Sequence, residues 1–86
     1  MVASTGHNEY FNSLRVIAGQ VALDLGLTMK EMHERTHLHR VSHARQEAFR
    51  RQYAAGHSLP KIARWWGYDH TTVLWGIRSA EKRRKS

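Results

Sequence analysis

Residues 58–73 read SLPKIARWWGYDHTTV, and this stretch decides the fold. Ser58 is a favourable helix N-cap, and Pro60 falls in the first turn, where its missing N–H costs nothing. Gly67 is a typical helix stop, and Asp69 caps a second helix almost at once. Two helices joined by so short a glycine turn predict a helix-turn-helix. The apolar side of the first of these helices is formed by Leu59, Ile62, Ala63 and Trp66.

The second helix of this pair has an apolar side of its own. Its predicted buried positions are Val73, Leu74, Ile77 and Ala80, and it then runs into the basic sequence EKRRKS. We expect residues 83–86 to form a flexible basic tail.

Upstream, apolar residues recur every three or four positions from Phe11 to Leu25, which predicts a helix that begins at Asn8. Gly26 ends it, and Thr28 with Glu31 forms a capping box that opens a short second helix. Residues 33–43 hold four of the seven histidines and predict a basic loop. Ser42 is the expected cap of a third helix that ends at Gly56.

These elements predict an all-α protein, a compact bundle of about five helices without strands. A chain of 86 residues supports one small domain, which we place at residues 8–82. We expect residues 1–7 to be a disordered N-terminus. The chain has no cysteine, which excludes disulfides and thiolate metal sites and fits a cytoplasmic, nucleoid-associated protein.

Charge is distributed unevenly along the chain. The formal net charge is +7 and the sequence pI is about 10.6, in the range typical of nucleic-acid-binding domains. Residues 1–34 have two basic and four acidic side chains, whereas residues 35–86 have twelve basic and three acidic ones. The second part is therefore the one suited to a polyanion.

The helix that follows Asp69 begins with a compact group of polar side chains. A recognition helix meets base edges with the residues just after its cap. Thr71 and Thr72 each supply a hydroxyl and a methyl, His70 supplies a ring nitrogen, and Asp69 accepts from a cytosine amino group. The alternative is that Asp69 only caps the helix and the threonines only satisfy its first N–H groups. On the second helix of a helix-turn-helix, base reading is favoured.

The stretch GHSLPKIARWWGYDHTTVLWGIRSAE, with RVSHARQEAF before it, resembles the C-terminal DNA-binding domain of the bacterial replication initiator DnaA. The matching features are HSLP.I, the glycine, DHTTV and the upstream ARQ, and the resemblance covers residues 9–82. It implies that Asp69, His70, Thr71 and Thr72 contact bases in the major groove, and that an arginine of the basic loop enters the minor groove. Arg45 and Gln46 match polar positions near phosphate and base.

The chain also departs from that family. Tyr68 stands where the family usually has an arginine, and histidines dilute the basic loop. No GxxxxGK[ST] motif occurs, so we expect no nucleotide to bind. The residues expected to hold phosphates or reach the minor groove are Arg35, His37, Arg40, His43, Arg45, Gln46, Lys61, Arg64 and Tyr68.

The functional expectation is a sequence-specific double-stranded DNA-binding protein, a transcriptional regulator in class. Two alternatives remain open: a stand-alone or excised module that binds replication origins, and a protein-interaction module that uses residues 8–25 with Tyr10 and Phe11. We expect neither catalysis nor a cofactor, because no nucleophile or acid–base motif is present. No apolar run is long enough for a membrane span. A zinc site would have to use His33, His37, His39 and His43, without cysteine.

Overall fold

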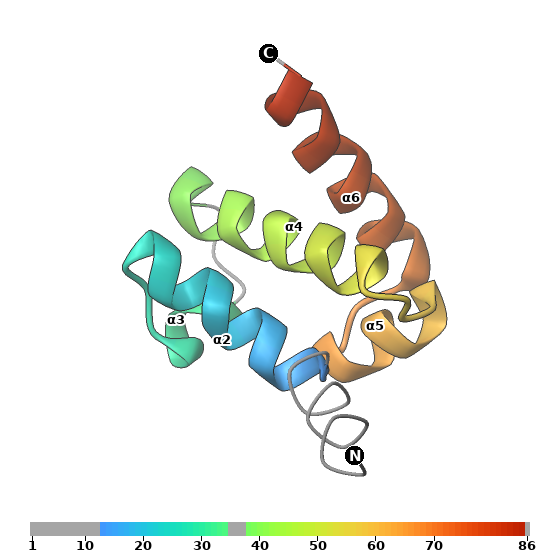
Figure 1. Ribbon diagram of the computed structural model, residues 1–86, viewed down its shortest axis with the longest axis horizontal. Helices are drawn as coiled ribbons and strands as arrows, with labels where there is room; N and C mark the ends of the chain where they lie inside the picture. The colour runs from blue at the N-terminus through green and yellow to red at the C-terminus, as the bar shows by residue number, and fades with distance from the viewer. Residues whose placement is uncertain (1–12, 35–37, 86) are drawn as a thin grey trace, which may run out of the picture.

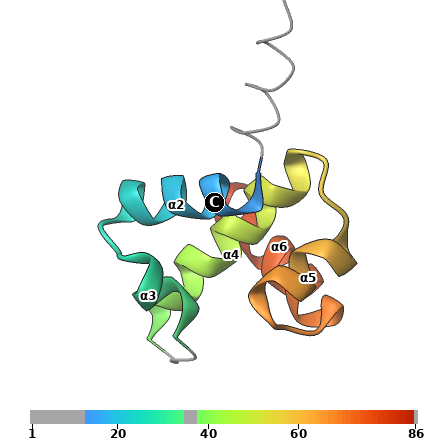
Figure 2. The same ribbon diagram turned by 90° about the horizontal axis from the view of Figure 1, so that it is seen from below.

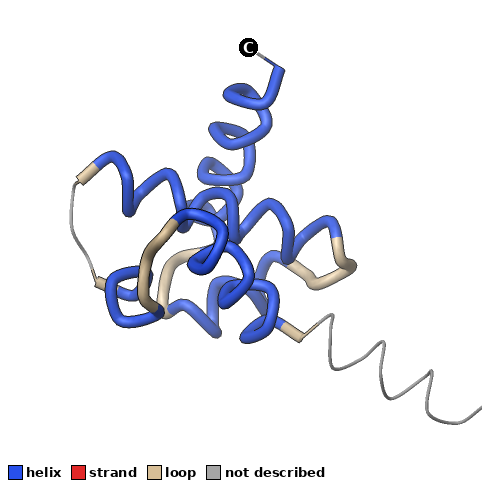
Figure 3. Tube along the Cα trace, turned by 60° about the vertical axis from the view of Figure 1, so that its left-hand side comes forward, coloured by secondary structure: helices blue, strands red, loops and turns tan. Residues whose placement is uncertain are grey.

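The protein is described from a computed structural model, which places residues 13–34 and 38–85. These residues form five α-helices: α2 Leu14–Leu25, α3 Met29–His33, α4 His39–Ala54, α5 Leu59–Trp66 and α6 His70–Lys85. No strand occurs in either range, so the all-α prediction is confirmed (Figure 3). The central helix is α4, which contacts the other four; α2 and α3 lie on one side of it and α5 and α6 on the other (Figures 1 and 2).

Two predicted helix signals are confirmed at the start of the chain. Gly26 ends α2 in the left-handed conformation, with φ of 70°. The capping box at Thr28 is complete, because the Thr28 hydroxyl accepts from the Glu31 N–H at 3.1 Å and the Glu31 carboxylate accepts from the Thr28 N–H at 2.8 Å.

The predicted first helix does not run without a break through Ser13. Ser13 has extended backbone angles and its hydroxyl accepts the Val16 N–H at 3.2 Å, so α2 begins at Leu14. Residues 8–12, with Tyr10 and Phe11, lie outside the described residues, as do residues 1–7. The three- and four-residue spacing of apolar positions continues across Ser13. A serine at an N-cap does not interrupt that spacing, so the spacing alone does not reveal the cap.

The predicted basic loop is too long, because α4 already begins at His39 and Ser42 is inside the helix. Leu38, at the N-cap, makes no side-chain capping bond. Packing accounts for the early start: Val41 and Ala44 are buried at three-residue spacing and continue the stripe of Ala48 and Phe49. Tertiary burial therefore extends the helix beyond the capping serine that the sequence offered.

The turn between α5 and α6 is short and well bonded. Ser58 caps α5 through the Lys61 N–H, and Gly67 ends it with φ of 79°. The N–H groups of Gly67 and Tyr68 both donate to the Ala63 carbonyl, and the Asp69 carbonyl accepts the Val73 N–H, so α6 starts after Gly67–Asp69. A flexible tail was expected at residues 83–86, but residues 83–85 are helical, because α6 continues through Lys85.

The core lies where α4 meets the other helices, and the described residues bury two polar side chains, Arg45 and Gln52. Gln52 is fully buried: its amide donates to the Leu14 carbonyl at 2.9 Å and accepts from the Trp66 indole at 2.8 Å. Trp66 is thus a core residue, as predicted. Gly76 lets α6 approach α4 closely, since a Cβ there would lie 2.7 Å from the Phe49 ring.

Candidate nucleic-acid interface

The Asp69–Thr72 corner, defined as Asp69, His70, Thr71 and Thr72, lies on the surface at the start of α6. All four residues are exposed. The side chains of Asp69 and His70 are 75% and 64% exposed, and 4.0 Å separates Oδ1 of Asp69 from Nδ1 of His70. The core face of α6 is formed by other residues, Val73, Gly76, Ile77 and Ala80. The corner therefore offers hydroxyls, methyls, an imidazole and a carboxylate to an external partner.

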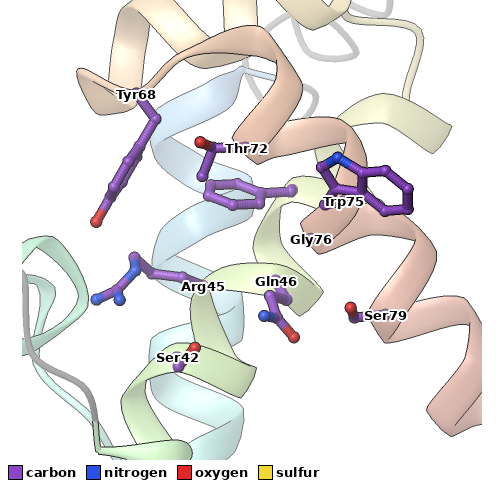
Figure 4. A pocket seen from close by; sticks show the side chains of 9 residues that line it. Ser42, Arg45, Gln46, Tyr68, Thr72, Trp75, Gly76 and Ser79 are labelled. Atoms are coloured by element: carbon purple, nitrogen blue, oxygen red, sulfur yellow. The ribbon is translucent and has the colours of Figure 1, made fainter.

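Beside the corner, a hollow of about 320 Å³ is lined by residues of α4, α6 and the turn before α6 (Figure 4). We call it the α4–α6 hollow. Thr72 belongs both to the corner and to the lining of the hollow, and Trp75 stands at its edge in Figure 4. The wall therefore combines hydroxyl and amide groups with aromatic faces. Its residues are Ser42, Arg45, Gln46, Phe49, Tyr68, Thr72, Trp75, Gly76 and Ser79.

Arg45 points into the fold, although the sequence suggested a phosphate ligand. The side chain is buried, and its guanidinium donates to the backbone carbonyls of Met32 and Glu34. Its Cζ atom also lies 5.8 Å from the centroid of the Tyr68 ring. These contacts connect α4 to the end of α3 and to the α5–α6 turn, so in this structure Arg45 has a structural role.

Tyr68 and Gln46 are likewise engaged within the fold. Tyr68 is half-buried, and its ring meets Phe49 edge-on with 6.0 Å between centroids. The Gln46 side-chain oxygen accepts from Nη1 of Arg83 at 2.7 Å, while Nη2 of Arg83 lies 3.4 Å from the His43 carbonyl. Gln46 is thus paired with the far end of α6, away from the corner.

Arg40 is exposed, yet its guanidinium contacts the end of α2. Its Nη2 atom donates to the Gly26 carbonyl at 3.0 Å and lies 3.5 Å from the Leu25 carbonyl. A cation at the C-terminus of a helix satisfies its last carbonyls and matches the negative end of the helix dipole.

His43 is exposed on α4, next to His39, with 5.5 Å between the two ring centroids. Partial burial, and after it the charges of Arg83 and His39, lower the pKa of His43 from its ordinary value of 6.5. The imidazole is therefore mostly neutral at pH 7 and offers a phosphate a hydrogen bond more than a charge.

The remaining predicted cations divide into two groups. Lys61 and Arg64 are exposed on α5, three residues apart, on the helix that precedes the corner. Arg35 and His37 lie outside the described residues.

Sequence reasoning missed two kinds of residue near the corner. Ser42 and Ser79 line the α4–α6 hollow, and the Arg78 guanidinium lies 5.6 Å from the Trp75 ring centroid. Trp75 is 60% exposed. The sequence could have indicated Arg78, because it follows Thr71 by seven positions and residues at that spacing lie on the same face of a helix.

The histidines do not form a metal site in the part of the chain that the structure describes, where no group of three or more His, Cys, Asp or Glu side chains converges. The His33 ring instead packs on Trp65 and Trp66, with centroid distances of 5.2 and 4.8 Å. Within residues 13–34 and 38–85, no helix combines the length and apolar character that crossing a bilayer requires.

The exposure of the Asp69–Thr72 corner and the charge of the residues around it indicate what this surface can bind. Comparison of the chain with protein-family models, with curated proteins and with solved structures gives no match.

Proposed function

We propose that this protein binds double-stranded DNA sequence-specifically, as a transcriptional regulator in class, with the start of α6 in the major groove. The observation that carries the proposal is the exposure of all four corner side chains together at the first turn of α6. A helix enters the groove by this end, and the groove displays the donors, acceptors and thymine methyls that these groups match.

The basic residues around the corner also favour DNA as the partner. Lys61 and Arg64 are exposed on α5, and α6 continues from the corner into four basic residues at its last turn. Cations on both sides of a base-reading corner position a protein on the backbone, whereas the corner provides the sequence preference. The resemblance of residues 9–82 to the DnaA C-terminal domain agrees with this division of roles.

The proposal is tested by selecting bound duplexes from a random pool and comparing a selected duplex with a scrambled one. In Thr71→Ala/Thr72→Ala we expect the affinity ratio between the two duplexes to fall roughly tenfold or more, because each lost base contact is worth about 1–3 kcal/mol of discrimination. Binding to the scrambled duplex should remain close to that of the wild type, since phosphate contacts are retained.

Two variants serve as controls. Thr71→Ser/Thr72→Ser keeps the hydroxyls and removes the methyls, so it separates hydrogen bonding from thymine contact. Gln20→Ala/Leu23→Ala alters two exposed positions of α2, remote in sequence from the corner, and should leave the ratio unchanged. A wild-type protein that enriches no sequence, or an alanine pair that keeps the full ratio, would contradict the proposal.

A further inference from the structure

One face of α6 carries a continuous row of exposed side chains from the corner to the end of the helix. They stand at intervals of four, three, four and three residues, which at 3.6 residues per turn keeps them within about 80° of arc. We call this row the outer stripe; its members are Thr71, Trp75, Arg78, Lys82 and Lys85, and all of them are exposed.

The outer stripe lies on the side of α6 opposite the core, with Trp75 at the edge of the α4–α6 hollow. The core side of α6 is occupied by Val73, Gly76, Ile77 and Ala80, which lie on the opposite side of the helix. Towards its C-terminus, α6 also extends past the other helices, as Figures 1 and 3 show from two directions. The basic end of the outer stripe is therefore available to a long partner that already contacts the corner.

The direction of this helical end is fixed by contacts with α4. Arg83, which is not in the stripe, donates to the Gln46 side chain at 2.7 Å and approaches the His43 carbonyl. Gly76 allows the close approach to Phe49 one helical turn after Thr72. The stripe thus belongs to a helix held at two points along its length.

The positive charge of the outer stripe favours an anionic partner. Arg78, Lys82 and Lys85 provide three cations in line, and Glu81 is the only acidic residue between His70 and Lys85. Glu81 lies off the stripe, one position before Lys82. The distance from Thr71 to Lys85 is about 21 Å at a rise of 1.5 Å per residue, comparable to about six steps of 3.4 Å along one DNA strand.

We infer that the outer stripe is a second DNA contact, in which Arg78, Lys82 and Lys85 follow the phosphates of the strand beside the bases that the corner reads. This inference rests on the proposed function and adds to it a defined footprint on one flank. Trp75 stands between the two parts of the contact, beside Arg78.

The test measures how the DNA affinity depends on salt for Lys82→Gln/Lys85→Gln. Each lost phosphate contact lowers the slope of log K against log salt by about 0.9, so we expect a loss of roughly 1.8 and an affinity at 0.1 M salt that is lower by at least about tenfold. The effect should disappear on a duplex trimmed by about six base pairs on the contacted flank, and persist when the other flank is trimmed.

Two matched controls separate the stripe from general charge. Arg15→Gln/Lys30→Gln removes the same charge from exposed positions of α2 and α3 and should leave the slope nearly unchanged. The single variants Lys85→Gln and Arg84→Gln remove neighbouring cations of one helical turn, of which only Lys85 is in the stripe. Only Lys85→Gln should lower the slope.

Equal salt slopes for Lys85→Gln and Arg84→Gln would contradict the inference, and so would an effect of Lys82→Gln/Lys85→Gln that survives trimming of either flank. Either result would indicate that the basic end of α6 binds DNA nonspecifically. An unchanged slope in Lys82→Gln/Lys85→Gln would overturn the inference as well. The comparison of slopes is possible on any duplex and is therefore independent of sequence preference, whereas the trimming experiment uses the selected duplex. Failure of the proposed function would appear instead as a wild-type protein that does not discriminate between duplexes.

Discussion

Arg45, a predicted DNA ligand, makes contacts that stabilise the fold. Its guanidinium donates to the carbonyls of Met32 and Glu34 at the end of α3. The last carbonyls of a helix have no partner within it, and a five-residue helix such as α3 has little stability of its own. Arg45 therefore holds α3 in place and, through Tyr68, contacts the turn that leads into α6.

We expect Arg45→Ala to lower the free energy of unfolding by about 2–3 kcal/mol, because it leaves buried carbonyls without a charged donor. Arg45→Lys should recover only part of this loss, since lysine keeps the charge but lacks the planar guanidinium that lies over the Tyr68 ring. Urea unfolding followed by circular dichroism measures both variants. The control is Arg64→Ala, an exposed arginine of α5, with an expected change within about 0.5 kcal/mol.

If Arg45→Ala were as stable as Arg64→Ala, the guanidinium would contribute nothing to the fold. Arg45 would then return to the set of candidate phosphate ligands, and its loss should weaken every duplex alike.

Among the helices, the contact between α4 and α6 depends on a glycine. Gly19 and Gly76 both lie inside helices, where alanine is intrinsically favoured by about 1 kcal/mol. A Cβ at Gly19 would meet nothing within 4 Å, whereas one at Gly76 would lie 2.7 and 3.0 Å from two atoms of the Phe49 ring. That ring is confined by Trp66 and Tyr68, so it has little room to move.

The two glycines therefore predict opposite results. Gly19→Ala should stabilise the protein by about 0.5–1 kcal/mol. Gly76→Ala should destabilise it by about 1–2 kcal/mol, because overpacking at Phe49 exceeds the gain in helix propensity. Thermal unfolding of the two variants side by side measures both signs. A stabilised Gly76→Ala protein would mean that α6 moves away from α4 at little cost.

The elements predicted correctly are those whose signals are local. The Thr28 capping box, the glycine stops at Gly26 and Gly67 and the Ser58 cap each require only neighbouring residues. The start of α4 was missed because Val41 is buried by other helices, and that burial outweighs the capping serine at Ser42.

The corner is predictable for the same reason that the caps are, since its four exposed residues follow directly from the turn at Gly67. The contacts of the basic side chains cannot be predicted from their neighbours in the sequence. Arg40, Arg45 and Arg83 are bonded to groups far away in the sequence, and nothing in their own neighbourhood distinguishes them from Lys61 or Arg64.

For the molecule as a whole, a network of charges joins the acidic first part of the chain to the basic second part. Glu47 of α4 accepts from Arg50 at 2.7 Å and from Arg51 at 2.8 Å, and Arg51 also contacts Asp24 of α2 at 3.0 Å. Hydrogen bonds from Arg50, together with those from Arg51, lower the pKa of Glu47 from 4.5 to about 2 although partial burial opposes the change.

This lowered pKa gives the stability of the protein a defined pH dependence. A carboxyl group whose pKa is lower in the folded state than in the unfolded state stabilises the fold fully above its unfolded pKa. The contribution of Glu47 is therefore complete above about pH 5 and is lost as the pH falls towards 2. After allowance for solvent screening, we expect Glu47 to contribute on the order of 1–2 kcal/mol to the free energy of unfolding.

Glu47→Gln isolates this contribution from the rest of the acid unfolding. The protein is already basic and gains further positive charge as the pH falls, and self-repulsion then destabilises wild type and variant alike. The difference between the two unfolding free energies should consequently be largest near pH 7 and vanish near pH 2. Glu34→Gln, which removes an exposed carboxylate beyond α3, is the matched control for the loss of one negative charge. A gap between Glu47→Gln and wild type that stayed constant from pH 7 to pH 2 would mean that packing of the Glu47 side chain, and not its charge, connects α4 to its arginines.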